Sequence, residues 1–515
     1  MKRSFKKIVY TVLALGAVFI IGTVSINIIL KNKLEDFIKT RLPENMIRSY
    51  DDITVETFGG SLSITNASLI IRNKKNNQEH TFVNVEKLKI SDISYWNYLF
   101  NEEIHIENIS LESPTIAHYE NRIEKNEDSR RNSFVSIYKP IIIENLKINN
   151  TKLAIFEKGK DSTKLYTKGL SVELDGIKID KKTITQKIPI EYKTYKAKSD
   201  TVFVKLGPYE NLTAKGFRIE NRNAKFNDLT LKTKYSKRKL SRLITKERDH
   251  YNLSLNSVSI NSIDFGFKHN RFFAKSTMIS LTAPSLEIYR DKLVVDDLKT
   301  KPLYSKMLRD LPFELTVDSL KITDGKIKYE ERQNAENMGG SINFENLNAE
   351  MANVSNTYKS PTKTEIEIKS NFMGKTPITV NWSFDVQNME DQFQFRAEVG
   401  QLVAERLNSF TEPNLKVMLE GNTNKTYFTI DGNNTSSTID MKINYSDFKV
   451  ILLQKDGKDK NKFLSTIANI FISKNSEKKD EFYKEGKANA TRNKSKSVFN
   501  FLWINVKEAL IKILI

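Results

Sequence analysis

The sequence predicts a mainly β protein, and three observations carry this prediction. Short runs of alternating apolar and polar residues, separated by Asn, Asp, Ser, Gly and Lys, fill the chain from about Thr54 to Tyr445. One strand phrase recurs, as in EIHIENISLE from Glu103 and IIIENLKINN from Ile141. The 515 residues are too many for one simple core, so we expect several modules or one repeating architecture.

A transmembrane helix is predicted ahead of the β-region. Residues 8–30 carry no charge, and at about 1.5 Å per helical residue this run would span roughly 34 Å. The basic residues of segment 1–7 place that end in the cytoplasm, and everything from Lys31 onward on the far side of the membrane. A cleaved signal peptide is the alternative, but the apolar run is longer than usual and the charged KNKLEDFIKTR follows it.

The recurring phrase predicts stacked β-units. Its copies start at Ile104, Ile141, Leu253 and Leu315, and each has apolar residues at alternate positions on both sides of a polar pair. The alternation of apolar and polar positions shifts by one residue at that pair. A bulge or turn is therefore required there if the apolar residues are to stay on one buried face. Such units rely on their neighbours for burial. We expect an elongated, repetitive, mostly antiparallel β-groove, taco-like or β-solenoid-like; a filled β core is the other interpretation of the same columns.

The predicted organisation has seven segments. Helices are expected only at Lys33 to Leu42, at Leu303 to Leu311 and over the last eighteen residues or so. In chain order the segments are a cytoplasmic basic end (1–7), the transmembrane helix (8–30), a juxtamembrane helix and linker (31–53), the N-terminal part of the groove (54–300), its C-terminal part (301–453), a basic polar linker (454–497) and an amphipathic helix (498–515).

The sequence carries no sign of catalytic chemistry. The five histidines are scattered, without metal-binding spacing, and no phosphate-binding glycine loop or nucleophile elbow occurs. His105 and His118 fall within one repeat but lack a third ligand. The absence of cysteine excludes disulfides and thiolate metal sites. We expect no catalytic residue, no metal and no cofactor, and hence a protein that is not an enzyme.

The charge balance leaves the partner open. Lys and Arg number 82 against 63 acids, a net charge of +19, with basic clusters at residues 232–248 and 474–496. Nucleic acid conflicts with the expected export, and no nucleic-acid motif occurs. Attraction to anionic lipid headgroups fits better, at about 1 kcal/mol per basic residue near such a surface. The other interpretation is that the charge only keeps the protein soluble.

The last segment predicts an amphipathic helix with two possible roles. Apolar residues recur every three or four positions between Val498 and Ile515, and polar residues interrupt a full membrane span. The helix either lies in a membrane interface or caps the open end of the groove. The candidate interface residues are Phe499, Leu502, Trp503, Val506 and Leu510.

Three stretches resemble the AsmA-like superfamily of TamB- and YhdP-related envelope proteins, in its Bacteroidetes-type form. They are ISDISYWNYLFNEEIHIENISLESPTIAHYE from Ile90, KPLYSKMLRDLPFELTVDSLKITDGKIKYEER from Lys301, and MKINYSDFKVILL from Met441 with the basic tail and SVFNFLWINVKEALIKILI. The resemblance implies an inner-membrane helix, a periplasmic β-groove with an apolar interior, and a role in phospholipid movement or outer-membrane biogenesis. The chain is shorter than the bridging relatives.

By that resemblance, nine residues are candidates for lining a lipid groove. They are Ile104, Ile106, Leu111, Ile143, Ile148, Leu255, Ile260, Val317 and Ile322. An apolar channel would lower the barrier to moving an acyl chain through water, which costs about 0.8 kcal/mol per methylene. The expected partners are phospholipid or another acyl lipid and the inner membrane through residues 8–30, with envelope assembly proteins as a further candidate. The rival function is a scaffold for envelope assembly with a filled core.

Overall fold

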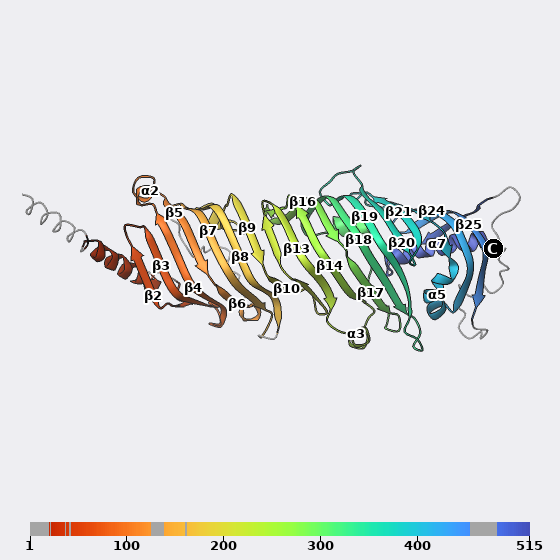
Figure 1. Cartoon of the computed structure of the whole chain (residues 1–515), viewed down its shortest axis with the longest axis horizontal. Coiled ribbons are helices and arrows are strands. Elements are labelled where there is room, and N and C mark those ends of the chain that lie inside the picture. The colour runs from red at the N-terminus through yellow and green to blue at the C-terminus, as the bar shows by residue number, and fades with distance from the viewer. Residues whose placement is uncertain are drawn as a thin grey trace, which may run out of the picture. The chain divides into compact units, whose positions relative to one another are not determined.

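A computed structural model describes residues 20, 22–36, 38–40, 43–124, 139–159, 162–453 and 482–514. The protein is mainly β, as predicted. The chain divides into two compact units: unit 1 comprises Met1–Leu206 with Thr213–Asn221, and unit 2 comprises Gly207–Leu212 with Arg222–Ile515. Figure 1 shows long strands in each unit, with short helices at the strand ends.

Unit 1 is a sheet in which each strand pairs with strands close to it in the sequence. Its strands are β1 (Met46–Ser49), β2 (Asp52–Glu56), β3 (Ser61–Arg72), β4 (Glu79–Ile93), β5 (Ile104–Glu112), β6 (Thr115–Tyr119), β7 (Ile141–Phe156), β8 (Thr163–Ile179), β9 (Thr194–Ser199), β10 (Thr201–Lys205) and β12 (Phe217–Glu220). Strand β3 pairs with β1, β2 and β4, and β8 pairs with β7, β9 and β10. The division between the units runs through β11 (Glu210–Ala214).

Unit 2 holds the remaining strands in the pairing order β13, β14, β16 with β17, β18, β19, β20, β21, β22, β24, β25, β26. They are β13 (Asn223–Thr233), β14 (Asp249–Asn261), β15 (Asp264–Lys268), β16 (Arg271–Thr282), β17 (Ser285–Asp291), β18 (Glu314–Arg332), β19 (Gly340–Ser355), β20 (Thr364–Phe372), β21 (Thr376–Phe384), β22 (Phe393–Val399), β23 (Leu402–Val403), β24 (Val417–Gly432), β25 (Ser436–Leu452) and β26 (Lys484–Thr491).

Two of the three predicted helices are confirmed within their expected ranges, as α4 (Tyr304–Arg309) and α7 (Val498–Leu514). The third, predicted at Lys33 to Leu42, overlaps the end of the N-terminal helix, which is described at residues 22–36 and 38–40. Three short helices were not predicted: α2 (Tyr95–Phe100), α3 (Lys237–Leu243) and α5 (Asn408–Leu415). Ser94 caps α2 and Ser236 caps α3, because their hydroxyls accept hydrogen bonds from the backbone N–H groups of Asn97 and Lys239. These serines were sequence signals for a helix start, but they lie among residues with a strand pattern. Single-turn helices occur at Glu120–Arg122, Thr183–Thr185 and Ala404–Leu407.

The predicted membrane-crossing anchor is not supported. Among the described residues, no helix is both long and apolar enough to span a bilayer. Residues 8–19 and 21 of the predicted span lie outside the described residues. Its described end contacts the β-structure, because the Asn27 side chain accepts hydrogen bonds from the Thr57 N–H and hydroxyl and Lys31 pairs with Asp52 at 2.8 Å. The single-pass inner-membrane localisation is therefore withdrawn.

Two of the four copies of the recurring phrase become neighbouring strands, whereas the copies on β14 and β18 are separated by β16 and β17. β5 and β7 pair in parallel, with Ile104 opposite Ile141 and Ile106 opposite Ile143, so two copies of the phrase lie in register side by side. β16 and β17 likewise pair in parallel with β18. Most described pairings are antiparallel, as expected, but these parallel pairs make the sheet mixed.

The shift at the polar pair is accommodated by left-handed residues on the neighbouring strand. On β5 the pairing passes over Glu107, and Asp92 on β4 has a φ of 61°. Asp318 on β18 is likewise passed over, and Asn353 on β19 has a φ of 58°. Such a backbone suits Asn, Asp and Gly. The irregularity keeps Ile106 and Ile109 in one apolar cluster despite their odd spacing.

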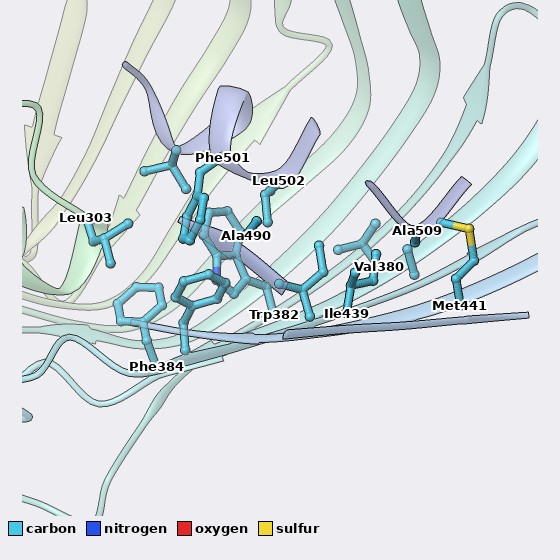
Figure 2. Packing of buried hydrophobic residues seen from close by; sticks show 14 of the residues in the cluster. Leu303, Val380, Trp382, Phe384, Ile439, Met441, Ala490, Phe501, Leu502 and Ala509 are labelled. Carbon is cyan, nitrogen blue, oxygen red and sulfur yellow. The ribbon is translucent and has the colours of Figure 1, made fainter. Parts of the chain in front are cut away.

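The last strands of unit 2 and helix α7 enclose the main hydrophobic core. Figure 2 shows Phe501, Leu502 and Ala509 of α7 facing side chains of the sheet, which include Val380, Trp382, Phe384, Ile439 and Met441. The Ser497 hydroxyl accepts a bond from the Asn500 N–H near the start of α7. This helix therefore covers one face of the sheet.

Part of the predicted 454–497 linker is a strand. Lys484–Thr491 forms β26, which pairs with β25, while residues 454–481 lie outside the described residues. Gly486, Ala488 and Ala490 alternate along β26. A Cβ on Gly486 would lie 2.5 Å from the Ile513 side chain, so the small residues allow α7 to approach closely. This alternation of small residues was the sequence signal for the strand.

Candidate functional site

Unit 2 carries two uninterrupted apolar rows on one face, which we call the unit 2 face. Directly paired residues share a face, so the registers give the rows. The first row, from β13 to β25, is Phe226, Val258, Leu281, Ile322, Ala349, Ile368, Val380, Ala397, Phe428 and Met441. The second, from β13 to β26, is Ala224, Ile260, Ile279, Leu320, Met351, Ile366, Trp382, Phe395, Ile430, Ile439 and Ala488.

Burial along these rows changes where α7 begins to cover them. Trp382, Ile430 and Ile439 are buried in the α7 core. Ile260 and Ile279 of the same row are only half-buried. Phe395 and Phe428 near α7 are only partly buried, and the small Ala224 is buried without it. The residue types are otherwise similar, so the deeper burial of Trp382, Ile430 and Ile439 reflects the covering helix.

Unit 1 has a corresponding face, the unit 1 face. One of its rows contains Ile53, Ile64, Leu88, Leu111, Ile148, Val172, Ala197 and Ile219, from β2 to β12. A second contains Val55, Leu62, Ile90, Ile109, Leu146, Leu174 and Tyr195. Ile106, Ile143 and Ile177 form a small buried cluster beside these rows.

The predicted groove residues divide into two groups by burial. Ile106, Ile143, Leu255 and Val317 are buried. Ile104, Leu111, Ile148, Ile260 and Ile322 are half-buried. Leu111 and Ile148 lie in one row of the unit 1 face, and Ile260 and Ile322 lie in the two rows of the unit 2 face.

Sequence reasoning missed most members of the rows, including Ile279, Leu281, Met351 and Ile366. These residues lie in strands that do not repeat the phrase, such as β16 and β20. The available signal was simple alternation within each strand, as in MISL of β16 and EIEI of β20.

A charged row borders the unit 2 face at one end of its strands. Asp249, Arg290 and Glu331 lie opposite one another on β14, β17 and β18. The Arg290 guanidinium donates two hydrogen bonds of 2.7 Å to the Asp249 carboxylate. Tyr251 and Tyr329, two residues inward, donate their hydroxyls to Asp249 and Glu331. The apolar rows therefore end at satisfied polar groups.

The tyrosines of this border ionise with difficulty. Burial, reinforced by the Asp249 carboxylate, raises the pKa of Tyr251 to about 12, and burial with Glu331 raises the pKa of Tyr329. The neutral Tyr251 hydroxyl stabilises the fold fully below about pH 10, where tyrosine is neutral when unfolded too. This contribution is lost as pH rises from about 10 to about 12.

Subtracting the tyrosinate absorbance titration of Tyr251→Phe from that of the parent chain is expected to leave one step near pH 12. The titrations should stay within the pH range where circular dichroism shows both chains folded. A difference step near pH 10, the ordinary tyrosine value, would contradict the burial argument.

Among the described residues, no group of three or more His, Asp or Glu side chains is arranged to hold a metal ion. His105 lies by Glu103 and Glu144, whereas His118 shares the Thr81 hydroxyl with His80. The two histidines of this repeat therefore face different neighbours. Burial and the nearby His118 lower the pKa of His80.

The C-terminal helix packs apolar residues against the sheet. Leu502 is buried in the core, and Val506 and Leu510 pack against it. Of the candidate interface residues, only Phe499 and Trp503 are exposed. The apolar face of α7 is therefore occupied by the sheet.

The basic segment at 232–248 is partly neutralised by the fold. Lys237 pairs with Glu330, and Arg248 pairs with Glu210. The Arg248 guanidinium also stacks 4.5 Å from the Tyr209 ring centre. Part of the local excess of positive charge is therefore structural.

Comparison with known proteins identifies no relative: no protein-family model matches the chain, and no curated protein matches it.

Proposed function

We propose that this chain is a non-enzymatic lipid-carrying protein of the AsmA-like kind, whose apolar sheet faces form a groove that shields the acyl chains of a phospholipid or another acyl lipid. A role supporting outer-membrane biogenesis follows from the same proposal. The single observation that supports it is the change in burial along the unit 2 face. Beneath α7 six row members, among them Trp382 and Ile430, are buried, whereas over β13 to β18 every row member larger than alanine stays half-buried.

The physical argument concerns what such a surface does in water. Monomeric proteins rarely leave contiguous apolar patches above a few hundred Å² exposed, because each Å² costs roughly 25 cal/mol. An apolar row that crosses many strands forms a larger contiguous apolar area than isolated surface leucines do. An acyl chain is a suitable occupant because it is apolar along its length and needs no specific hydrogen bond.

The charged border adds a place for the polar end of the lipid. Asp249 lies at the opposite end of β14 from Ile260, roughly 36 Å away at about 3.3 Å per residue. Only an acyl chain lying nearer that end, over Leu253 and Leu255, would bring its polar end to the Asp249, Arg290 and Glu331 row. Because Arg290 is already paired with Asp249, this border offers polarity and not a free charge.

A scaffold with a filled core is the second candidate, and one observation favours it. The eighteen buried members of the α7 cluster form a packed interior between the helix and the sheet. A scaffold would need the rest of the unit 2 face to be covered by a protein partner instead of lipid.

The test is the lipid content of the purified full-length chain. We expect extraction and mass spectrometry to find bound phospholipid, and Ile260→Asp with Ile322→Asp to lower the amount at least about tenfold, since about 1.4 kcal/mol of lost affinity suffices. These half-buried positions are preferable to Ile143, which is buried and whose replacement would disturb the fold.

The matched control is Ser254→Asp with Thr323→Asp. Both residues are exposed, they lie on the same two strands, and they pair with polar residues of the opposite face. This control should retain lipid. If the Ile260 and Ile322 variant fails to fold, a photoreactive residue at position 260, compared with one at 254, replaces it. Equal lipid labelling at both positions, or lipid no higher than in an unrelated protein, would refute carriage.

A further inference from the structure

Helix α2 of unit 1 buries none of its side chains. Its sequence is YWNYLF, and Tyr95, Trp96, Tyr98, Leu99 and Phe100 are between 46% and 68% exposed. Trp96 and Phe100 contact each other one helical turn apart, with ring centres 4.2 Å apart. Burial of its own apolar side chains therefore does not explain this helix.

The helix is nevertheless fixed in place by the strands on either side. The Ser94 N–H donates to the His105 carbonyl of β5, and the Ser94 hydroxyl caps the helix. The Lys139 ammonium donates to the Tyr98 carbonyl at 2.9 Å and lies 4.2 Å from the Tyr98 ring centre. The aromatic side chains are thus presented from an ordered support, which Figure 1 shows at the ends of β4 and β5.

Thr57 connects α2 to a second exposed apolar element. The Thr57 carbonyl accepts a bond from the Tyr95 hydroxyl, and the Thr57 N–H donates to the Asn27 side chain of the N-terminal helix. The adjacent Phe58 is 65% exposed. Ile20, Val24 and Ile28, spaced at four residues on that helix, are also exposed.

We propose that Phe58, Tyr95, Trp96, Tyr98, Leu99 and Phe100, called the aromatic patch, lie in the interfacial layer of a lipid bilayer. Trp and Tyr favour this layer because their rings are apolar and their N–H or O–H groups remain hydrated. The neighbouring aliphatic row of the N-terminal helix supplies the apolar contact that an interfacial helix makes. The contact is with the bilayer surface and requires no membrane-crossing segment.

The surrounding charges fit a bilayer better than an acidic or basic protein partner. The helix itself carries no charge, Lys139 stacks on Tyr98, and Lys31 is held by Asp52. Glu56, Glu102 and Glu103 border the patch, with Glu56 accepting a bond from Ser61 and Glu103 lying beside His105. The patch is thus an uncharged aromatic surface with mixed charge around it. This inference is independent of lipid carriage by the sheet faces.

Trp96 reports on the proposed contact directly. The chain has three tryptophans; Trp382 is only 7% exposed, and Trp503, which is 47% exposed, is removed by Trp503→Phe. The full-length variant is mixed with phosphatidylcholine and phosphatidylglycerol vesicles whose acyl chains are brominated or unmodified. We expect a shift of Trp96 emission to shorter wavelength and strong quenching by the brominated chains. The further change Trp96→Phe should abolish this response.

Leu99→Ser with Phe100→Ser should weaken both the quenching and the flotation of the protein with vesicles. Leu298→Ser with Met389→Ser is the control, since these residues of unit 2 are equally exposed, and it should leave both unchanged. Trp96 emission that stays as in buffer when brominated vesicles are present would overturn the proposal, whether or not the chain floats with them. A protein partner would then be the better explanation of the patch.

Discussion

Truncation of Phe501 to alanine is expected to lower the free energy of unfolding by about 3–5 kcal/mol, the usual cost of removing a buried phenyl ring. Phe501 is 2% exposed and faces Phe393 at a ring-centre distance of 6.2 Å, within the core that Figure 2 shows. The sheet and α7 are joined through this side chain, so the cavity left by alanine cannot close without moving the helix. Denaturant unfolding followed by tryptophan fluorescence measures the loss.

Phe499→Ala is the matched control on the same helix. Phe499 is 63% exposed, so its truncation removes the same ring without creating a cavity. Little change in unfolding free energy is expected. Equal losses for the two variants would mean that α7 is not docked on the sheet as described, and the explanation of burial along the unit 2 face would fail with it.

The second large effect is expected at Asp391, in the turn between β21 and β22. Its carboxylate is 2% exposed and accepts hydrogen bonds from the Arg309 guanidinium at 2.7 Å and the Ser305 hydroxyl at 2.9 Å. Arg309 also donates to the Val386 and Asn388 carbonyls. Asp391→Ala leaves a buried guanidinium without its counter-charge, so we expect a loss of about 3–5 kcal/mol in unfolding free energy.

A double-mutant cycle separates the pair from its surroundings. Arg309→Ala with Asp391→Ala should cost less than the sum of the two single changes, because each single change leaves one buried charge unmatched. Asp440→Ala, which breaks an exposed pair with Lys487, should change stability little. Additive single effects at Arg309 and Asp391 would show that the two side chains do not depend on each other.

The repeated phrase predicted which residues of each copy are apolar, but not which strands pair. Because Ile104 and Ile141 occupy the same place in two copies, their strands can pair in parallel without changing the apolar face, and they do. The polar pair required an irregularity, and Asp92 with its positive φ meets that requirement from the neighbouring strand. No local signal in either phrase could name Asp92 as the compensating residue.

The N-terminal helix shows where a local pattern was insufficient. Hydropathy averages a segment by itself and takes no account of tertiary contacts. The hydrogen bonds of Asn27 to Thr57 and the ion pair of Lys31 with Asp52 join distant parts of the chain. In α2 the opposite holds, because apolar residues that a pattern assigns to a core are exposed.

By itself, the sequence determined the mainly β architecture, the apolar side of each repeated strand, and helices within Leu303 to Leu311 and the last eighteen residues. These features follow from alternation and helical spacing, which are local. Only the tertiary structure decided which part of an apolar row is covered. Ile260 and Ile430 are equally apolar, and Ile430 is buried because the α7 core, built from residues far along the chain, packs over it. Burial depends on such distant contacts, so the strand pattern alone cannot specify it.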